Sequence, residues 1–208
     1  NKECTTNIIN RLLKHSDGNV YAFCNRSVFK CSMNQTVETV FPDIAIPSPT
    51  YSVAQAPDKD IYIGTESNGL YIYSENWKLK KHVPIDGIIA TILPDNNGDI
   101  WLGLDETGIC LFNKNKQTFT WLHKDNTNLN NNSIRTFVSY GDSSILVGTF
   151  RGLNILNKKE LTITPANINI AGKGGLSHYS IHSMLIDKDQ TLWIGTYSAG
   201  VNYHSPFY

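Results

Sequence analysis

The chain has 208 residues, 40% of them hydrophobic, and its 18 Lys and Arg balance its 18 Asp and Glu. This composition excludes a disordered chain, and the length allows one substantial core. A neutral chain has no general attraction for nucleic acid or anionic lipid, no apolar run approaches the ~20 residues that span a bilayer, and no N-terminal signal pattern is present. We therefore expect this segment to bind no nucleic acid and to insert directly into no membrane.

Four stretches repeat nearly the same pattern, in which a strand-like run ends near one glycine and a second glycine follows a short turn. The first glycines are Gly64, Gly103, Gly148 and Gly195, at successive spacings of 39, 45 and 47 residues. Such a period holds about four short strands with their turns, and the segments are rich in Ile, Tyr, Trp, Val and Thr. No apolar stripe at helical spacing persists for three turns. The pattern predicts an all-β protein, a β-propeller of four-stranded blades.

In the third to fifth units an apolar residue lies eleven positions before the middle strand and extends the unit upstream, whereas the second unit has Thr50 there. The same offset adds a fifth, divergent unit at the N-terminus, with Ile9 and Leu12 in its first strand. The blades of this single propeller segment are expected near residues 5–46, 47–85, 86–127, 128–175 and 176–208. First strands are expected around Ile9, Val53, Ile89, Ile134 and Ile181. Second strands are expected around Tyr21, Tyr62, Trp101, Leu146 and Trp193. Third strands are expected around Phe29, Tyr71, Leu111, Ile155 and Asn202, and fourth strands at 77–83, 118–123 and 161–164.

The fifth blade is expected to lack its outer strand, because the sequence stops at Tyr208. A propeller needs a closed ring, and an unpaired sheet edge favours association with another chain. About five blades therefore indicate a piece of a larger ring or of a longer protein. We expect the isolated segment to self-associate or to need the rest of the propeller.

The four cysteines carry little information. Cys4, Cys24, Cys31 and Cys110 show neither a C-x-x-C pair nor a metal-ligand spacing. Cys24 and Cys31 flank one hairpin, and a turn at residues 25–26 makes position 24 face position 27. Buried thiols are therefore favoured over a disulfide, which would need a different register. The cysteine count assigns no redox compartment.

The repeated residues are assigned to the scaffold. Gly64, Gly103, Gly148 and Gly195 are expected where a strand ends at a tight turn, and Gly69, Gly108, Gly152 and Gly200 where the backbone adopts an angle that other residues resist. Tyr62, Trp101 and Trp193 share one strand position, where packing between blades is favoured over the alternative of a sugar-stacking platform. The turn residues Asp17, Asp58, Asp95, Asp142 and Asp187 are read as turn formers, since each turn offers one carboxylate and calcium takes about six to eight oxygens.

The unit with Asp-x-x-Gly-x-Ile-Trp-Ile-Gly-Thr-x-x-x-Gly-Leu resembles the two-component-regulator propeller repeat of Bacteroides-type hybrid sensor histidine kinases. Asp95, residues 98–103 and Gly108 carry the resemblance in the third unit, and residues 187–196 with Gly200 in the fifth. It implies a periplasmic sensor region with seven-bladed propellers and an immunoglobulin-like domain, followed by a cytoplasmic kinase in a dimeric inner-membrane parent. This chain departs from that plan, because it holds about five units and no kinase segment.

Function is expected where the copies differ, in the loops from the second to the third strand and between blades. These loops mix carboxylates, amides, arginine and aromatics, a chemistry suited to hydroxyl-rich or anionic ligands. Arg135 and His182 fall at matching first-strand positions and are expected to point toward the propeller axis. For each residue singly, a solvated or hydrogen-bonded structural role is the commoner one. The candidate ligand-binding residues are Glu66, Asn68, Asp105, Glu106, Asn132, Arg135, Arg151, Tyr179, His182 and Tyr197.

We expect a sensor module that binds carbohydrate fragments and, through its parent, regulates transcription of polysaccharide-utilisation genes. A structural or protein-interaction propeller without a small ligand remains open, as does a polysaccharide lyase or glycosidase, for which Glu66 with Glu106 is the better-placed carboxylate pair. The sequence has no nucleophile elbow, no H-E-x-x-H and no phosphate loop. We therefore expect no catalysis by this segment, no cofactor and no metal site.

Overall fold

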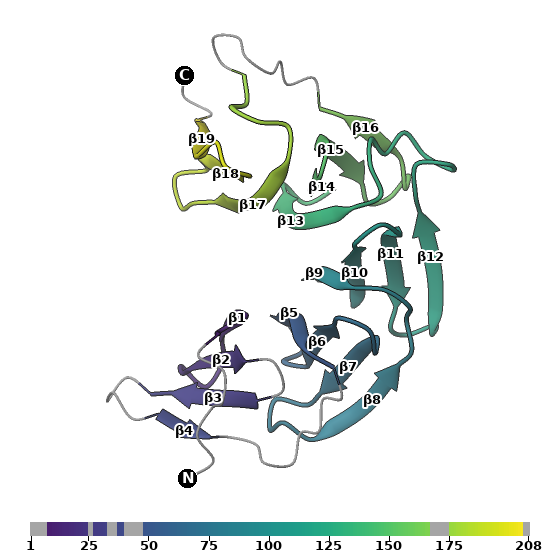
Figure 1. The fold of residues 1–208 in the computed structure, drawn as a ribbon. Helices are drawn as coiled ribbons and strands as arrows, with labels where there is room; N and C mark the ends of the chain where they lie inside the picture. The colour runs from purple at the N-terminus through teal and green to yellow at the C-terminus, as the bar shows by residue number, and fades with distance from the viewer. Residues whose placement is uncertain (1–7, 25–26, 33–36, 40–47, 167–174, 206–208) are drawn as a thin grey trace. The chain divides into compact units, whose positions relative to one another are not determined.

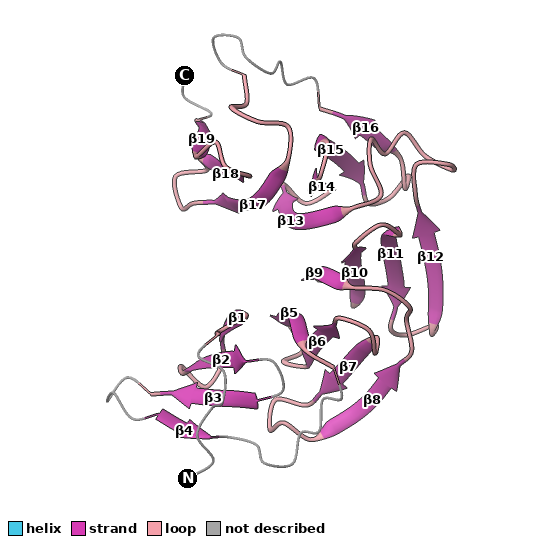
Figure 2. Ribbon diagram, in the orientation of Figure 1, coloured by secondary structure: helices cyan, strands magenta, loops and turns pink. Residues whose placement is uncertain are grey.

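The computed structural model describes residues 8–24, 27–32, 37–39, 48–166 and 175–205. The chain divides into two compact units, residues 1–100 with 113–116 (unit 1) and residues 101–112 with 117–208 (unit 2). All regular elements among the described residues are strands, and none of these residues forms a helix that could span a membrane (Figure 2). The prediction of an all-β protein is confirmed.

The strands form five sheets, which we number as blades 1 to 5 in chain order (Figure 1). Blade 1 contains β1 (Arg11–Lys14), β2 (Val20–Cys24), β3 (Ser27–Cys31) and β4 (Val37–Thr39). Blade 2 contains β5 (Thr50–Gln55), β6 (Ile61–Thr65), β7 (Leu70–Tyr73) and β8 (Leu79–Val83). Blade 3 contains β9 (Ile89–Pro94), β10 (Asp99–Leu104), β11 (Gly108–Asn113) and β12 (Thr118–Leu122).

Blade 4 contains β13 (Ile134–Tyr140), β14 (Ser144–Thr149), β15 (Gly152–Asn157) and β16 (Ile163–Pro165). Blade 5 contains β17 (Ile181–Ile186), β18 (Leu192–Thr196) and β19 (Val201–His204), and no fourth strand is found among its described residues. Each sheet is ordered as its strands follow in the sequence. Such antiparallel meanders of four short strands are the blades of a β-propeller, as the repeat predicts.

The hairpin turns within the blades are held by aspartate side chains. Asp17 accepts the backbone N–H of Asn19 at 2.9 Å, and Asp187 accepts those of Asp189 and Thr191, each at 2.9 Å. Asp58 and Asp95 accept backbone N–H groups in the same way. A carboxylate that bonds its own backbone stabilises a tight turn, so these four residues act as turn formers.

The first glycine of the repeat is the penultimate residue of its strand, so it lies near the strand end, as expected. A Cβ on Gly64 would lie 2.6 Å from Ile89 Cγ2, and one on Gly148 would lie 2.6 Å from Ile181 Cγ2. In both cases the isoleucine belongs to the first strand of the next blade. Glycine is needed here because neighbouring blades approach closely. The second glycine does adopt a positive φ, for example 118° at Gly152.

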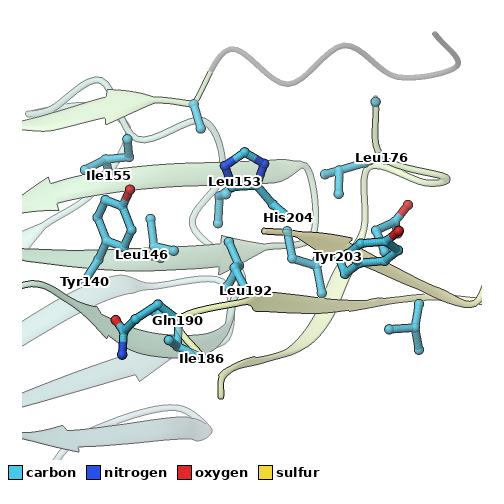
Figure 3. Close-up of a pocket in the computed structure, with 15 residues that line it drawn as sticks. Tyr140, Leu146, Leu153, Ile155, Leu176, Ile186, Gln190, Leu192, Tyr203 and His204 are labelled. Atoms are coloured by element: carbon cyan, nitrogen blue, oxygen red, sulfur yellow. The ribbon is translucent and has the colours of Figure 1, made fainter. Parts of the chain in front are cut away.

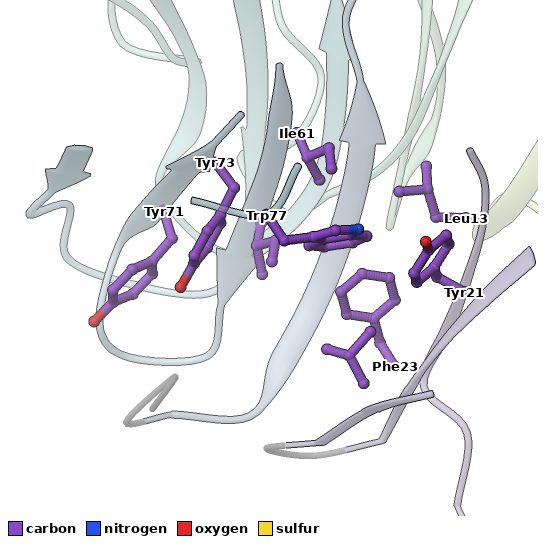
Figure 4. Close-up of a cluster of buried hydrophobic side chains, with 9 residues drawn as sticks. Leu13, Tyr21, Phe23, Ile61, Tyr71, Tyr73 and Trp77 are labelled. Carbon is purple, nitrogen blue, oxygen red and sulfur yellow. The ribbon is translucent and has the colours of Figure 1, made fainter. Parts of the chain in front are cut away.

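In unit 1, blades 1 and 2 pack face to face around Trp77, which lies just before β8 (Figure 4). Its ring centroid is 4.8 Å from that of Tyr21 and 6.0 Å from that of Phe23. Aromatic pairs at such distances add to the stabilisation from burial. The cluster comprises Leu13, Tyr21, Phe23, Val28, Ile61, Ile63, Tyr71, Tyr73 and Trp77.

The N-terminal blade departs from one detail of the prediction. Ile9 precedes β1, and both Ile9 and Leu12 are exposed, whereas Leu13 is buried. Successive residues of a strand point to opposite faces. Since Leu13 packs into the cluster with blade 2, Leu12 faces the other side, which no described sheet covers.

Blade 5 exposes one apolar face. Trp193 is 40% exposed, whereas its equivalents Tyr62 and Trp101 are buried as expected. Val201 is 68% exposed, although its equivalent Leu70 is fully buried. No described blade follows blade 5, so the packing of Trp193 between blades stays a prediction. Its Nε1 donates to Asp187 Oδ2 at 2.7 Å.

The hairpin register also separates two thiols. Cys24 pairs with Ser27 and Cys31 with Val20, so the strand that joins them keeps the two sulfur atoms apart. The predicted register of this hairpin is confirmed, and no disulfide links Cys24 to Cys31. Cys110 is a buried thiol in β11, and its burial raises its pKa to about 12. Cys4 lies outside the described residues.

Candidate functional site

Three first strands carry a β-bulge at the same place. The register shifts between Thr50 and Ser52 in β5, between Ile134 and Thr136 in β13, and between Ile181 and Ser183 in β17. The extra residues are Tyr51, Arg135 and His182. A bulge bends its strand and re-aims the side chain of the extra residue. Arg135 and His182 thus occupy matching positions, and Tyr51 joins them.

In these three blades, a backbone hydrogen bond joins the loop after the second strand to the residue just before the bulged first strand. The backbone N–H of its first residue donates to a carbonyl that precedes the first strand: Glu66 to Pro49, Phe150 to Ser133 and Tyr197 to Ser180, each at 3.0 Å. A threonine hydroxyl closes the loop from within, as Thr149 Oγ1 does on the carbonyl of Gly152 at 2.9 Å. The backbone of the first residue of each of these loops is therefore held in place, and the side chains of Phe150 and Tyr197 are exposed.

In unit 2 the bulge and the loops bring three side chains together. Arg135 Nη1 lies 3.4 Å from Asp105 Oδ2, and Arg135 Cζ lies 6.0 Å from the centre of the Phe150 ring. Asp105 directly follows β10, and Phe150 directly follows β14. Asp105 Oδ1 is buried, and no described group hydrogen-bonds to it. We call Asp105, Arg135 and Phe150 the Asp–Arg–Phe cluster.

The structure places the other sequence-based candidates in different settings. Asn132 has a structural role. Its backbone carbonyl accepts a hydrogen bond from Gly108 N at 2.9 Å, and its Oδ1 accepts one from Lys124 N at 2.8 Å. Glu106 and Arg151 are exposed in their loops. Tyr179 is exposed and stacks on His178, with 4.3 Å between ring centroids.

Three candidate ligand-binding residues lie on neighbouring segments of blade 5. Tyr179 precedes β17, His182 is at the bulge of β17, and Tyr197 follows β18. All three are exposed, and the hydrogen bond from Tyr197 N to Ser180 O ties the two loops together. Two tyrosines and an imidazole offer apolar surface with polar edges.

Unit 1 holds the remaining candidates. Asn68 donates its N–H to Thr65 Oγ1 at 3.0 Å, and its carbonyl lies 2.7 Å from His82 Nε2, so its backbone is part of the loop structure. Glu66 is exposed. Tyr51, at the bulge of β5, has the guanidinium carbon of Arg11 5.9 Å from the centre of its ring.

Sequence reasoning missed two residues of this surface. Tyr51 follows Thr50, the counterpart of Ile134 and Ile181, so the repeat spacing could have found it. Phe150 is the counterpart of Tyr197, one residue after the Gly-Thr pair of the repeat. Both positions could have been identified from the alignment of the units.

At the opposite end of the strands, unit 1 has a charged network. The buried Asp60 lies 2.6 Å from Lys80 Nζ and 2.6 Å from Lys114 Nζ, and Lys114 also contacts Asp58 at 2.5 Å. Burial opposes ionisation of Asp58, but the hydrogen bond from Lys114 outweighs it and lowers the pKa of this carboxyl. Burial raises the pKa of the neighbouring Tyr62 to about 12. The acids and lysines here pair with one another, so we assign the network to the scaffold.

Unit 2 contains a cavity of about 710 Å³ between blades 4 and 5 (Figure 3). The repeat makes Leu146 equivalent to Tyr21 and Leu192 equivalent to Ile61, and both leucines line it. The cavity thus matches the space that Trp77 fills in unit 1. Because its lining is largely aliphatic and its place is that of a packed side chain, we regard it as inter-sheet space. Apolar lining residues include Leu146, Leu153, Ile155, Leu192 and Ile194.

Among the described residues, no group of three or more His, Cys, Asp or Glu side chains is arranged to hold a metal ion. His178 and His182, which are close in sequence, lie in different settings. His178 precedes β17 and stacks on Tyr179, while His182 lies at the bulge.

Residues 175–198 match the family model described as the two component regulator propeller. This stretch of the chain is therefore similar to a two-component-regulator propeller repeat. The matched residues contain β17 and β18 with the loop before them, the part of blade 5 that bears Tyr179, His182 and Tyr197. A comparison with curated proteins found no match to this chain.

Solved structures with the same fold include extracellular domains of two component systems from B. thetaiotaomicron. One, the extracellular domain of a proposed hybrid two component system, is 24% identical with a TM-score of 0.74, over 96% of this chain and 27% of that one. A second such domain from this organism is 19% identical with a TM-score of 0.79, over 99% of this chain and 27% of that one. The chain therefore spans about a quarter of the length of these domains.

An enzyme also shares the fold. The virginiamycin B lyase of Staphylococcus aureus is 13% identical with a TM-score of 0.68, over 97% of this chain and 71% of that one. At these identities all three likenesses show the fold alone, and none transfers a ligand or an activity.

Proposed function

We propose that this chain is a ligand-binding segment of the extracytoplasmic, periplasmic sensor region of a hybrid two-component histidine kinase. The two-component-regulator propeller repeat and the fold shared with extracellular domains of such systems support this assignment. Phosphotransfer would then belong to another part of the parent protein. The ligand would be a carbohydrate fragment, and the response would be transcription of polysaccharide-utilisation genes.

One observation carries the carbohydrate assignment. The bulges of β13 and β17 present Arg135 and His182 beside loops that carry exposed aromatic side chains and whose backbone is held by hydrogen bonds. Sugar rings offer apolar faces and many hydroxyls, which match aromatic planes and charged hydrogen-bonding groups. Phe150 and Tyr197 on these loops, together with Arg135 at the bulge of β13, meet both needs.

Signalling requires that the ligand prefer one arrangement of the sensor over another. Backbone hydrogen bonds fix the loops to their own blades, so binding within a unit would change it little. We propose that the ligand instead biases the arrangement of two parent chains in a homodimer, with each propeller moving as a body.

Calorimetry tests the proposal directly. The 208-residue chain and the whole sensor region of its gene are titrated with a panel of neutral and uronate-containing oligosaccharides. We expect at least one saccharide to bind, and Tyr197→Ala to weaken its binding several-fold. The matched control is Tyr140→Ala, because Tyr140 is 51% exposed and lies at the other end of β13 from Arg135. If neither protein binds any saccharide of the panel, the proposed function is wrong.

A further inference from the structure

We infer that the open face of blade 5 binds the open face of blade 1 of a second copy of this chain, in a head-to-tail contact. The inference does not rest on the carbohydrate assignment. It continues the blade-to-blade interface that recurs within the units, because the two open faces carry the two halves of that interface.

The contact between blades 2 and 3 shows how one blade receives the next. Ser52 in β5 pairs with Gly64 in β6, and a Cβ on this glycine would lie 2.6 Å from Cγ2 of Ile89, the first residue of β9. Ser52 Oγ also donates a hydrogen bond to the carbonyl of Ile89 at 2.6 Å. In unit 2, a Cβ on Gly148 of blade 4 would lie 2.6 Å from Cγ2 of Ile181 of blade 5. One blade thus offers a socket at its glycine, and the next blade supplies an isoleucine.

Blade 5 has the same socket as blade 2, and it is open. Ser183 in β17 pairs with Gly195 in β18, and Ser183 is exposed. The three atoms nearest to a Cβ on Gly195 all belong to Ser183, so no described residue of another blade fills the space. An apolar row crosses the sheet beside the socket, and its members Leu185, Trp193 and Tyr203 pair with one another in turn and are 60%, 40% and 68% exposed.

Blade 1 exposes the residue that such a socket takes. Ile9 stands eleven residues before Val20, the same offset that separates Ile89 from Ile100. Ile9 is 58% exposed, whereas its equivalents in the later blades are fully buried. These equivalents are Ile89, Ile134 and Ile181.

A second apolar row crosses the open face of blade 1. Leu12 pairs with Ala22, and Ala22 pairs with Phe29, so the three side chains lie on one face of the sheet. Leu12 is 63% exposed. The small alanine at the centre of this row leaves room for a large side chain, and the row of blade 5 has Trp193 at its centre. The two rows are therefore complementary in shape, and the hydrophobic effect favours burying both.

A second copy is the occupant because one chain carries both halves of the interface. The contact joins two different faces, so each pair of chains still has one open face of each kind. Association of this type continues to larger species unless the assembly closes into a ring.

The test is analytical ultracentrifugation of the 208-residue chain and of two variants that each block one face. We expect the mass of the unmodified chain to rise with concentration in the micromolar range. Ile9→Asp blocks blade 1, and Val201→Asp blocks blade 5, because Val201 pairs with Gly195 and lies on the same face as the socket. Both positions are more than half exposed in the single chain, so a charge there should not impair folding, but it would be buried in the contact.

Each aspartate variant alone should be monomeric, and their equimolar mixture should form a one-to-one dimer. Each variant keeps the face that the other has lost, so one contact forms and no further chain can add. Leu79→Asp is the matched control, because Leu79 is 50% exposed on the outer strand β8, and it should leave association unchanged. If an aspartate variant unfolds by circular dichroism, serine at the same position replaces it with the same expectation.

Gly195→Ala tests the socket itself. The added methyl group would occupy the position of the incoming isoleucine, so association should weaken about 10-fold or more, whereas within the single chain only the Ser183 hydroxyl has to move. Equal association of Gly195→Ala and the unmodified chain would overturn the inference.

Four other outcomes would also overturn it. The unmodified chain could stay monomeric throughout this range, or the mixture of the two aspartate variants could stay monomeric. Self-association of Ile9→Asp alone would indicate a contact between two copies of blade 5, and self-association of Val201→Asp alone a contact between two copies of blade 1. None of these outcomes bears on saccharide binding, so the proposed function is tested separately by its own titration.

Discussion

Alanine at the first glycine of the repeat should destabilise one blade and spare another. In Gly148→Ala the new Cβ would lie 2.6 Å from Ile181 Cγ2 and 2.7 Å from Thr136 Cγ2. Ile181 is fully buried in the next blade and cannot move away freely. In Gly195→Ala the new Cβ would meet Ser183 Oγ at 2.5 Å, and the other atoms of Ser183 lie 3.7 Å or more away. A hydroxyl can rotate aside.

The magnitudes follow from these neighbours. Overpacking of a tight interior costs about 1 to 3 kcal/mol. Replacing glycine by alanine also reduces the conformational freedom of the unfolded chain. This effect stabilises both variants by about 0.4 to 1 kcal/mol and offsets part of the destabilisation from overpacking. Gly148→Ala should therefore lose about 2 kcal/mol of unfolding free energy relative to Gly195→Ala. For a chain of this length the difference corresponds to a melting temperature about 4 to 8 °C lower.

Urea unfolding followed by circular dichroism measures the difference, with an unchanged m-value as the sign that only stability has changed. The two substitutions are identical in chemistry and in repeat position, so each serves as the control of the other. Equal destabilisation of the two variants, within about 0.5 kcal/mol, would refute the argument that glycine is needed here for the approach of the next blade.

Three further predictions concern single side chains. Cys110 should resist a thiol reagent at pH 8 in the native protein, because burial raises its pKa to about 12, whereas the partly exposed Cys31 should react; mass spectrometry of the labelled peptides checks this. Burial opposes ionisation of Asp17, but its hydrogen bonds lower its pKa overall. The ionised carboxylate should therefore stabilise the folded chain above the unfolded pKa of about 3.9, and this stabilisation should be lost as the pH falls. Asp17→Asn should flatten this acid dependence of the free energy of urea unfolding. Acrylamide should quench Trp193 more strongly than Trp101, as Trp→Phe variants at each position can show, and quenching of Trp193 should decrease with protein concentration if the open face of blade 5 mediates self-association.

The repeat spacing was sufficient to predict the fold, because the units share the spacing of their apolar strand residues and the position of their turn glycine. The buried first-strand residues Ile89, Ile134 and Ile181 were predicted from an eleven-residue offset alone. The same offset failed for Ile9, which is exposed. The local sequence pattern determines whether a strand forms. Burial of a strand residue depends on whether another sheet covers it, and the pattern of the strand itself does not show which sheet that is.

The candidate site was predictable in part. Loop composition marked Asp105, and a matching first-strand position marked Arg135. Their contact joins residues 30 positions apart in two blades, and no pattern within one unit reveals it. Tyr51 and Phe150 were missed because single exposed aromatics are common on protein surfaces. What distinguishes them is the bulge and the backbone hydrogen bond beside them, features of the backbone that side-chain identity does not determine.

The bulge explains how one scaffold can carry different recognition chemistry. Its backbone geometry recurs in β5, β13 and β17, while the residue it presents changes from tyrosine to arginine to histidine. Because the flanking residues Thr50, Ile134 and Ile181 are all buried, they fix the strand, and the extra residue is released from packing. A substitution at the bulge can therefore change a ligand contact at little cost to the blade. The feature that the three blades share is the bulge itself, and under the proposed function the side chain at the bulge is the variable part on which selectivity would depend.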